Sequence, residues 1–428
     1  MWGSAVLFAS FVVLLLLNIP IALCLGISSI VTMFYLHVPI SMLAMNIYAG
    51  IGKFTLLAIP FFVLAGCIMD KAGISAKLIN LADKFVGHKK GGLAFVCVIT
   101  SCFFAAISGS GPATVAALGS VIIPAMISAG YGVDMSSALM SAAGSIGIVI
   151  PPSIVFVVYS SITGVSVGKI FMAGVIPGIL MGIALIIASL FVLKKNKQLA
   201  MHTKATWEER WRAFIDAFWG ILMPVIILGG IYGGLFTPTE AAAVSAAYGL
   251  FVGLVIYRSM SLRDVVDILK EASVQSGGIM LIVGCASLFA WLCQSEGISD
   301  MASELLMSIG VNQTIFLLLI TAIMLVAGFF LEATSALYIF VPIIMPVAQA
   351  FKYDLVALGV ILTVNMAIGQ ITPPVGVNLY VACNIGGINL KQISKSVFPF
   401  VIALIIVLLI VTYIPSLSLF LPTFMGMK

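Results

Sequence analysis

Charged residues are scarce in this chain of 428 residues, because Asp, Glu, Lys and Arg together make up only 8% of it. Soluble globular domains contain about 25% charged residues. This deficit excludes a water-soluble enzyme of this size. Hydrophobic residues make up 62%, and many uncharged runs approach the roughly 20 residues that cross a bilayer as a helix. The composition therefore predicts an all-α polytopic membrane protein that lies in a lipid bilayer.

Motifs of enzymes and metal clusters are also missing. The chain has no P-loop, no G-x-S-x-G and no H-E-x-x-H, which argues against catalysis and against intrinsic ATP-driven pumping. The seven cysteines form no C-x-x-C pair, and the three histidines have no metal-ligand spacing. The net charge of +5 comes from basic residues in short loops, where they set topology. We therefore expect no enzymatic activity, no organic cofactor and no nucleic-acid partner.

Two regions differ from ordinary membrane-spanning runs. In each, a first apolar run is broken by a polar or acidic cluster, and a second is broken by a double proline, Pro151-Pro152 or Pro373-Pro374. Halves of about 13–18 residues are short for a crossing, which favours a re-entrant hairpin for the first run and one crossing with an unwound centre for the second. The predicted hairpins are 92–130 and 313–351, and the predicted broken helices are 134–163 and 354–386. Single crossings are predicted at 4–17, 20–36, 54–70, 170–193, 218–235, 239–257, 273–293 and 397–421.

Basic residues set the orientation, because short cytoplasmic loops collect them. If 71–90 is cytoplasmic, 16 of the 20 Lys and Arg residues fall on that side. Ordinary double crossings in place of the hairpins would give the same count, so re-entrance rests on segment length alone. The stretch 196–217 contains an amphipathic segment with Trp207 and Trp211 on one face. It is predicted to lie in the cytoplasmic interface, and a simple surface connector is the alternative.

The two broken regions are related by an internal repeat. A shift of 222 positions places Pro151-Pro152 on Pro373-Pro374 and Ile146-Gly147 on Ile368-Gly369. We infer a duplication with repeats 1–195 and 218–428. Five crossings in each half invert the second copy relative to the first. Inverted repeats with broken helices are a structural mark of secondary transporters, and the breaks point to the binding site.

The breaks carry hydroxyl, amide and carbonyl groups but no Lys or Arg. Such oxygen ligands suit a small cation such as sodium, and a helix N-terminus beside them suits a carboxylate. An anionic substrate would need co-bound cations, which favours cation-coupled uptake. Small polar residues can also serve close helix packing, and this is the interpretation for Ser137. Glu332 is interpreted as a helix cap, with a direct role in transport as the alternative.

With these residues in view, the chain resembles the large membrane subunit (DctM or M subunit) of tripartite ATP-independent periplasmic (TRAP) transporters. The segments that carry the resemblance are 108–118, 147–153, 236–243 and 371–378. It implies an elevator-type, sodium-coupled importer of carboxylates, such as C4-dicarboxylates or sialic acid, in a bacterial inner membrane. It also implies a small four-helix membrane subunit and a periplasmic substrate-binding protein as partners.

The resemblance also implies roles for individual residues. One sodium site would use groups of the first half, at Ser108, Ser110, Gly147 and Val149. A second would use groups of the second half, at Gly328, Thr334, Gly369 and Thr372. Candidates for the substrate side are Ser153 and Asn378. The scaffold would comprise 1–53 and 218–272, and the mobile transport domain 54–193 and 273–428.

Two rival functions stay open at this stage. The first is a stand-alone dicarboxylate and sodium symporter of the same superfamily. The second is a pore, or a membrane scaffold, without coupled transport. A gene for a binding protein beside this one would favour the tripartite system, whereas conduction without saturation or a sodium gradient would favour the pore.

The charge distribution makes a topology prediction. Lys89, Lys195 and Lys391 should face the cytoplasm, while Ser299 and Lys352 should face the periplasm, because this arrangement collects the basic residues on one side. Single cysteines at these positions, in a background without the native seven, should be labelled from the corresponding side by an impermeant maleimide. Labelling of Ser299→Cys from inside only would overturn the inverted topology.

Overall fold

A computed structural model describes residues 2–194, 203–298, 300–301, 304 and 312–427, and these residues contain helices but no strand. Within this part, eight helices are long and apolar enough to cross a membrane. The prediction of an all-α multi-pass membrane protein is confirmed. Lys195, Ser299 and residues 196–202 of the predicted interfacial stretch lie outside the described residues.

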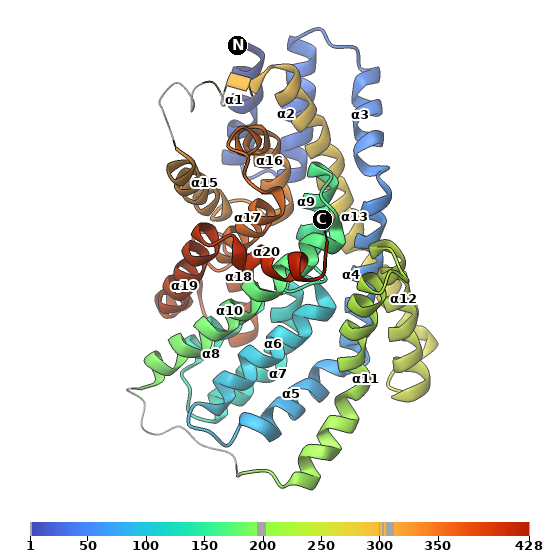
Figure 1. Ribbon diagram of the computed structural model, residues 1–428, viewed down its shortest axis with the longest axis vertical. Helices are drawn as coiled ribbons and strands as arrows, with labels where there is room; N and C mark the ends of the chain where they lie inside the picture. Colours follow the sequence, from blue (N-terminus) through green and yellow to red (C-terminus); the bar gives the residue numbers. More distant parts are fainter. Residues whose placement is uncertain (1, 195–202, 299, 302–303, 305–311, 428) are drawn as a thin grey trace.

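Figure 1 shows the arrangement of the helices. In the first half they are α1 (Trp2–Leu16), α2 (Ile21–Tyr35), α3 (Ser41–Ile51), η1 (Phe54–Leu57), α4 (Ala58–Lys71), α5 (Ile74–Val86), α6 (Gly92–Ser108), α7 (Gly111–Ser128), α8 (Val133–Gly144), η2 (Ser145–Ile148), α9 (Ile154–Thr163) and α10 (Val167–Leu193). In the second half they are α11 (Trp207–Tyr232), α12 (Pro238–Phe251), η3 (Val252–Ile256), α13 (Leu262–Ser295), α15 (Gln313–Gly328), α16 (Ala333–Ala350), α17 (Leu355–Gly369), α18 (Val377–Gly386), α19 (Leu390–Tyr413) and α20 (Ser416–Phe424).

Local sequence explains where the helices break. Gly109, at a φ of +62°, ends α6 in a left-handed conformation that a side chain would strain. Ser110 then caps α7 by accepting a hydrogen bond from the Ala113 N–H, and Pro112 occupies the first turn. Ser153 caps α9 in the same way after the double proline. In the second half, Gly376 stands before α18 at a φ of +50°.

Two predicted elements are parts of longer helices. The amphipathic residues 207–217 and the crossing from 218 form one helix, α11, which begins at a capping box between Thr206 and Glu209. The crossing predicted at 273–293 likewise belongs to a longer helix, α13, which begins at Leu262. A helix satisfies its own backbone groups in headgroups and hydrocarbon alike, so it has no need to stop where its side chains change from amphipathic to apolar.

Helix contacts have the pattern that two repeats would produce. Helix α7 packs against α18, and its counterpart α16 packs against α9. Likewise α4 packs against α12, and α13 packs against α2. The shift of 222 positions also places α3, which lies outside the predicted crossings, on 263–273 at the start of α13. Each pair becomes the other when the halves are exchanged, which supports the duplication.

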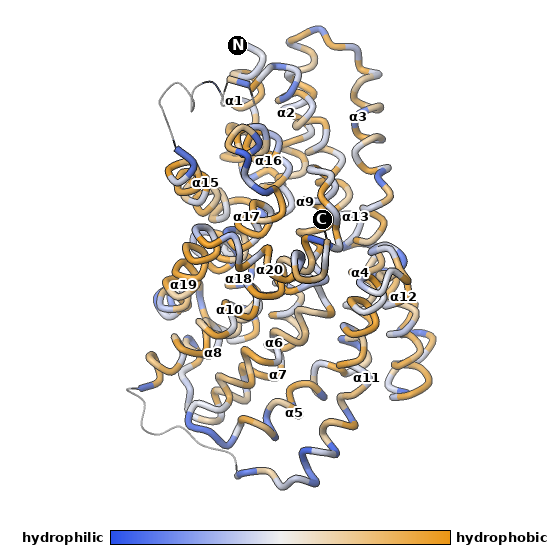
Figure 2. Tube along the Cα trace, in the orientation of Figure 1, coloured by the Kyte–Doolittle hydropathy of each residue, from blue (hydrophilic) through white to orange (hydrophobic). Residues whose placement is uncertain are grey.

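The helices form two groups that also touch each other. Helices α1–α4 pack with α11–α13, whereas α6–α10 pack with α15–α19. Helix α5 packs against both α6 and α11, and α13 also packs against α16. In Figure 2, hydrophobic residues cover most of the helices and hydrophilic residues gather near the ends of helices and in connecting segments. Large apolar side chains such as Leu16 and Phe191 are 80% and 71% exposed. A surface of this kind suits lipid rather than water.

Tyr159 connects the two halves within the second group. Its ring is fully buried, and its hydroxyl donates to the Leu355 carbonyl oxygen of α17 over 2.6 Å. The ring also lies against Gly359, where a Cβ would overlap it.

Tyr159→Phe should lower the free energy of unfolding by about 1 kcal/mol, because it removes one buried hydrogen bond and little volume. The matched control is Tyr48→Phe, whose parent side chain is 76% exposed. Thermal unfolding of both variants in detergent measures the effect. Equal midpoints for the two variants would contradict the assigned role of the hydroxyl.

Candidate functional site

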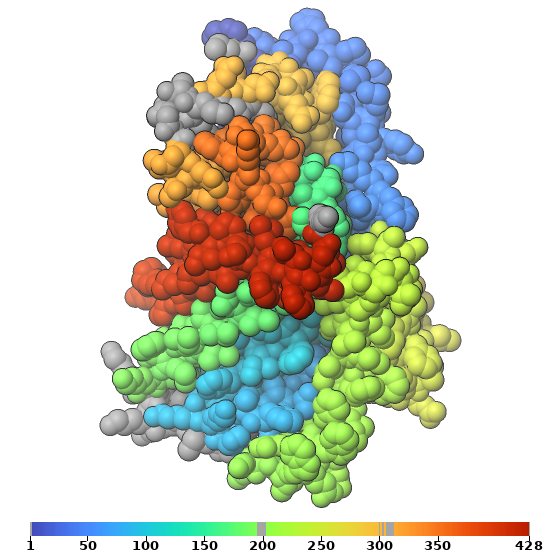
Figure 3. All heavy atoms as spheres, in the orientation of Figure 1, coloured from blue at the N-terminus to red at the C-terminus, as the bar shows by residue number. Residues whose placement is uncertain are grey.

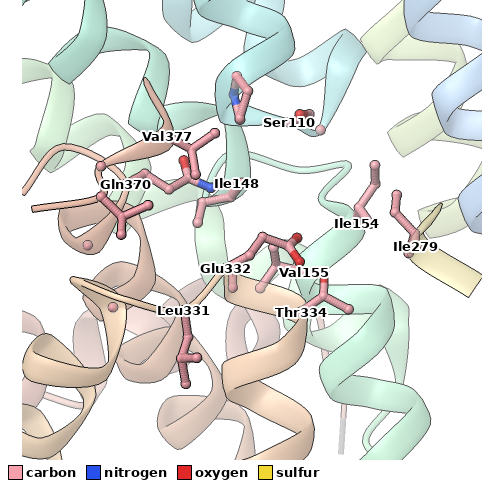
Figure 4. A pocket seen from close by; sticks show the side chains of 17 residues that line it. Ser110, Ile148, Ile154, Val155, Ile279, Leu331, Glu332, Thr334, Gln370 and Val377 are labelled. Atoms are coloured by element: carbon pink, nitrogen blue, oxygen red, sulfur yellow. The ribbon is translucent and has the colours of Figure 1, made fainter. Parts of the chain in front are cut away.

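Both hairpin tips and both broken helices meet at one cavity of about 90 Å³. Figure 4 shows its side chains, which come from segments far apart in the sequence. Four helices, α7, α9, α16 and α18, begin at this cavity, because it is lined by their first residues or caps. Its lining is Gly109, Ser110, Pro112, Ile148, Ile154, Val155, Ile279, Gly328, Leu331, Glu332, Ala333, Thr334, Gly369, Gln370, Val375, Gly376 and Val377.

Oxygen atoms cluster at the first tip. The Ser108 and Thr114 hydroxyls lie 2.9 Å apart, and the Thr114 hydroxyl donates to the Ser110 carbonyl over 2.7 Å. Gly147 approaches this cluster closely, since a Cβ there would lie 2.7 Å from the Ser110 carbonyl oxygen. The structure therefore brings Ser108, Ser110 and Gly147 together.

Two further details concern the first site. The Val149 carbonyl oxygen lies against Gly174 of α10, and its assignment as a sodium ligand stays a prediction. Thr114 belongs to the cluster but was not among the assigned sodium ligands. A signal existed in its spacing, because Thr114 follows Ser110 by four residues and so lies one helical turn further along the same face.

At the second tip the backbones themselves touch. A Cβ at Gly369 would lie 2.7 Å from both the Cα and the carbonyl oxygen of Gly328. Thr334 is buried and lines the cavity. The Thr372 hydroxyl donates to the Ile368 carbonyl over 2.7 Å, which leaves its lone pairs available for a cation.

The two candidates for the substrate side have different surroundings. The buried Ser153 hydroxyl bonds the Ile148 carbonyl and accepts from the Phe156 N–H over 3.3 Å, so it is engaged as a cap. Asn378 is buried and donates from Nδ2 to the Ser141 carbonyl over 3.2 Å. Among the described residues its Oδ1 has no hydrogen-bond partner. Neither residue lines the central cavity, and their assignment stays a prediction.

Glu332 and Gln370 do line the cavity. Within the described chain, Glu332 Oε2 and Gln370 Oε1 have no hydrogen-bond partner. Figure 4 shows both side chains reaching toward Ile148 and Val155 of the other half. Glu332 is the N-cap residue of α16, and its carboxyl group interacts with the side chain and the backbone N–H of Thr334 in the first turn. The interpretation of Glu332 as a helix cap stays a prediction.

Charges near the cavity are distributed unevenly. Among the described residues that line it, Glu332 is the only ionisable one, and none is Lys or Arg. Helix N-termini carry partial positive charge, and helix C-termini carry partial negative charge. The starts of four helices, the ends of α15 and α17 and the Glu332 carboxylate therefore allow an anion and a cation to bind side by side.

Comparison with known proteins places this architecture in a family. Residues 8–417 match the family model of the tripartite ATP-independent periplasmic transporter, DctM component. The chain belongs to this family. The C4-dicarboxylate TRAP transporter large permease protein DctM of Rhodobacter capsulatus is 38% identical to it, over 99% of this chain and all of that protein.

Other DctM-family relatives carry different substrate names. The sialic acid TRAP transporter large permease protein SiaM of Vibrio cholerae is 39% identical over 90% of both chains. The isethionate TRAP transporter permease protein DctMQ of Oleidesulfovibrio alaskensis is 40% identical over 97% of this chain and 66% of that protein. This DctM-family chain is thus a multi-pass membrane protein whose relatives are transporter permease components, and it is not an enzyme.

Solved structures share the fold at low sequence identity. The Alcanivorax borkumensis YdaH transporter superposes with a TM-score of 0.64 at 14% identity, over 90% of this chain and 89% of that one. MtrF of Neisseria gonorrhoeae superposes with a TM-score of 0.62 at 15% identity, over 88% and 83%.

The backbone contact at the second tip leads to a prediction. Gly369→Ala should lower stability by about 1–3 kcal/mol and reduce uptake, because a methyl group would force the Gly328 backbone away. Gly277→Ala is the control, since a Cβ there meets nothing within 4 Å. Thermal unfolding and uptake would be measured for both. If Gly369→Ala keeps the native stability and uptake, the close backbone contact between Gly369 and Gly328 has no role in either.

Proposed function

We propose that this DctM-family chain imports an organic acid together with sodium across a bacterial inner membrane. The observation that carries the proposal is the central cavity, where oxygen atoms without partners gather and no described lining residue is cationic. An acid that arrived alone would meet no positive side chain there. A bound cation would offset the charge of the acid and make its binding favourable.

Sodium suits the hydroxyl and carbonyl oxygens at the hairpin tips and helix breaks. Hydroxyl and carbonyl oxygens are hard ligands, and broken-helix carbonyls hold sodium in transporters with inverted repeats. Ser108, Ser110 and Thr114 supply such oxygens within 2.7–3.3 Å of one another. We assign the first sodium ion to this cluster and the second to the region of Gly328, Thr334, Gly369 and Thr372. The acid would then lie at the starts of α7, α9, α16 and α18.

In an elevator mechanism, one helix group would move as the transport domain relative to the other, which would act as the scaffold. The contacts of α4 favour a change to the domain boundary, because α4 packs with α12 and α13. Helix α13 packs with α2, α3 and α4 of the scaffold and in addition with α16. We therefore include α4 and 273–295 in the scaffold and keep α6–α10 and α15–α19 as the transport domain.

Partner subunits follow from family membership. The protein named DctMQ is longer than this chain, which covers 66% of it. The additional length supports a small membrane subunit that other systems would encode separately. A periplasmic binding protein would deliver the acid. The substrate names of the relatives include C4-dicarboxylate, sialic acid and 2,3-diketo-L-gulonate, which supports an organic acid as the class of substrate.

Removal of one oxygen ligand tests sodium coupling. Ser108→Ala or Thr114→Val should weaken the apparent sodium affinity on the order of tenfold, because one buried polar interaction is worth about 1–2 kcal/mol. Uptake should fall with it through reciprocal linkage of the two bound species, and raised sodium should partly restore it. Uptake would be measured in proteoliposomes with both partner subunits, across a sodium series at fixed membrane potential.

Ser137→Ala is the control for this experiment, since Ser137 in α8 is buried outside the cavity. It should keep the native sodium curve. The hypothesis fails if the tip variants also keep that curve, or if uptake is equally fast without sodium. Full uptake by the isolated chain would instead support the stand-alone symporter, and flux without saturation would support a pore.

A further inference from the structure

A second and larger crevice, of about 580 Å³, lies between the two helix groups. One wall comes from the end of α9 and the start of α10, in the transport domain. The other comes from η1 and the start of α12, in the scaffold. It shares no residue with the central cavity. Figure 3 shows green atoms of the α9–α10 region at the surface, bordered by blue atoms of the α3–α4 region and yellow-green atoms of α11–α12.

Positive charge is concentrated at this crevice. Lys169 lines it. Lys53 lies at its edge, because its ammonium donates to the Ser161 carbonyl over 2.6 Å. Neither lysine forms an ion pair with a carboxylate of the described chain. Each ammonium has three donors, so Lys53 retains two beyond its bond to Ser161.

Helix ends add to this positive potential. Helices α10 and α12 both begin at the crevice, with Ser166 and Thr237 as their caps. The first N–H groups of a helix have no partner within it and favour an anion. The nearest acidic residue in these two first turns is Glu240, which is held by the Thr237 N–H and hydroxyl in a capping box.

An independent observation points to a ligand here. The Ser160 side chain lines the crevice and is only 3% exposed, yet its hydroxyl has no hydrogen-bond partner in the described structure. A buried polar atom without a partner destabilises the folded protein. A hydroxyl can donate to a carboxylate oxygen, so an anion in the crevice would satisfy it.

We propose that this crevice is an anion-binding vestibule, which holds the carboxylate of an organic acid before it enters the central cavity. Helix α9 connects the two sites, since Ile154 lines the cavity and Ser160 lines the crevice, roughly 9 Å apart along the helix axis. The charge-based topology places Lys169 on the periplasmic side. The identification of the anion as the transported acid rests on the proposed function, whereas anion binding itself does not.

Cysteine modification in the purified full chain tests the vestibule without transport. Thr55 lines the crevice, and Thr55→Cys would be placed in a background without the native cysteines. We define the rate ratio as the rate of modification by an anionic methanethiosulfonate divided by the rate by a cationic one. The rate ratio at Thr55→Cys should be about threefold to tenfold higher than at the control Ser41→Cys. Ser41 is exposed and lies outside the crevice.

Substitution and competition define the site. The double substitution Lys53→Gln and Lys169→Gln should lower the rate ratio at Thr55→Cys to the value at Ser41→Cys. Lys169→Arg keeps the positive charge and should keep the higher rate ratio. Succinate should slow modification at Thr55→Cys and leave Ser41→Cys unaffected. Equal ratios at the two cysteines, or a ratio that ignores both lysines, would overturn the proposal. Protection by phosphatidylglycerol nanodiscs but not by succinate would assign the crevice to a lipid headgroup and would also overturn it.

A transport measurement separates this proposal from the proposed function. Lys169→Gln should raise the apparent KM for the acid several-fold and leave the sodium dependence unchanged. Loss of sodium dependence in the native protein would refute the coupling scheme but not the anion preference at Thr55→Cys. An unchanged KM would contradict the role of the vestibule in uptake.

Discussion

The structure depends on one constraint, which is that backbone N–H and C=O groups need partners wherever water is absent. Four helix breaks leave such groups without partners in their own helices, and the breaks satisfy some of them by meeting one another. The Ile154 N–H reaches the Gly109 carbonyl over 3.4 Å, and the Val375 N–H donates to the Phe329 carbonyl over 3.2 Å. Each bond joins a hairpin tip to the broken helix of its own half. The site is therefore a consequence of how the fold solves its backbone problem.

Electrostatics divide the proposed route into two stages. The crevice offers Lys169 and Lys53, whose charges attract an acid from water, where unit charges 4 Å apart interact by about 1 kcal/mol. The central cavity has no such cation and contains Glu332. A fixed lysine at the centre would bind the acid without sodium and would weaken coupling. In the proposed mechanism, separation of the fixed charges from the centre would leave sodium to supply the positive charge there.

Much of this arrangement could be predicted from the sequence, because glycine and proline are strong local signals in an apolar chain. The breaks around Gly109 and at the double prolines are examples. Continuity of α11 and α13 was not predictable, since the change from amphipathic to apolar side chains looks the same in the sequence whether the helix continues or ends there. The direction of the Val149 carbonyl depends on the tertiary packing of α10. The contact of Gly111 with Gln370 and Asn378 joins opposite halves, so no local pattern could reveal it.

The duplicated halves share a backbone frame but differ in chemistry. Gly147 and Gly369 are related by the shift of 222, and each approaches a backbone carbonyl of a hairpin, at Ser110 and Gly328 respectively. The surrounding side chains differ, because the first tip has the hydroxyls of Ser108 and Thr114 while the second has Glu332 and Thr334. The glycines thus fix how close two backbones come, and the hydroxyl and carboxylate groups fix what can bind between them. A side chain at either glycine would displace carbonyl oxygens by a few tenths of an ångström or more, and this displacement would act on ion binding even if every ligand residue were retained.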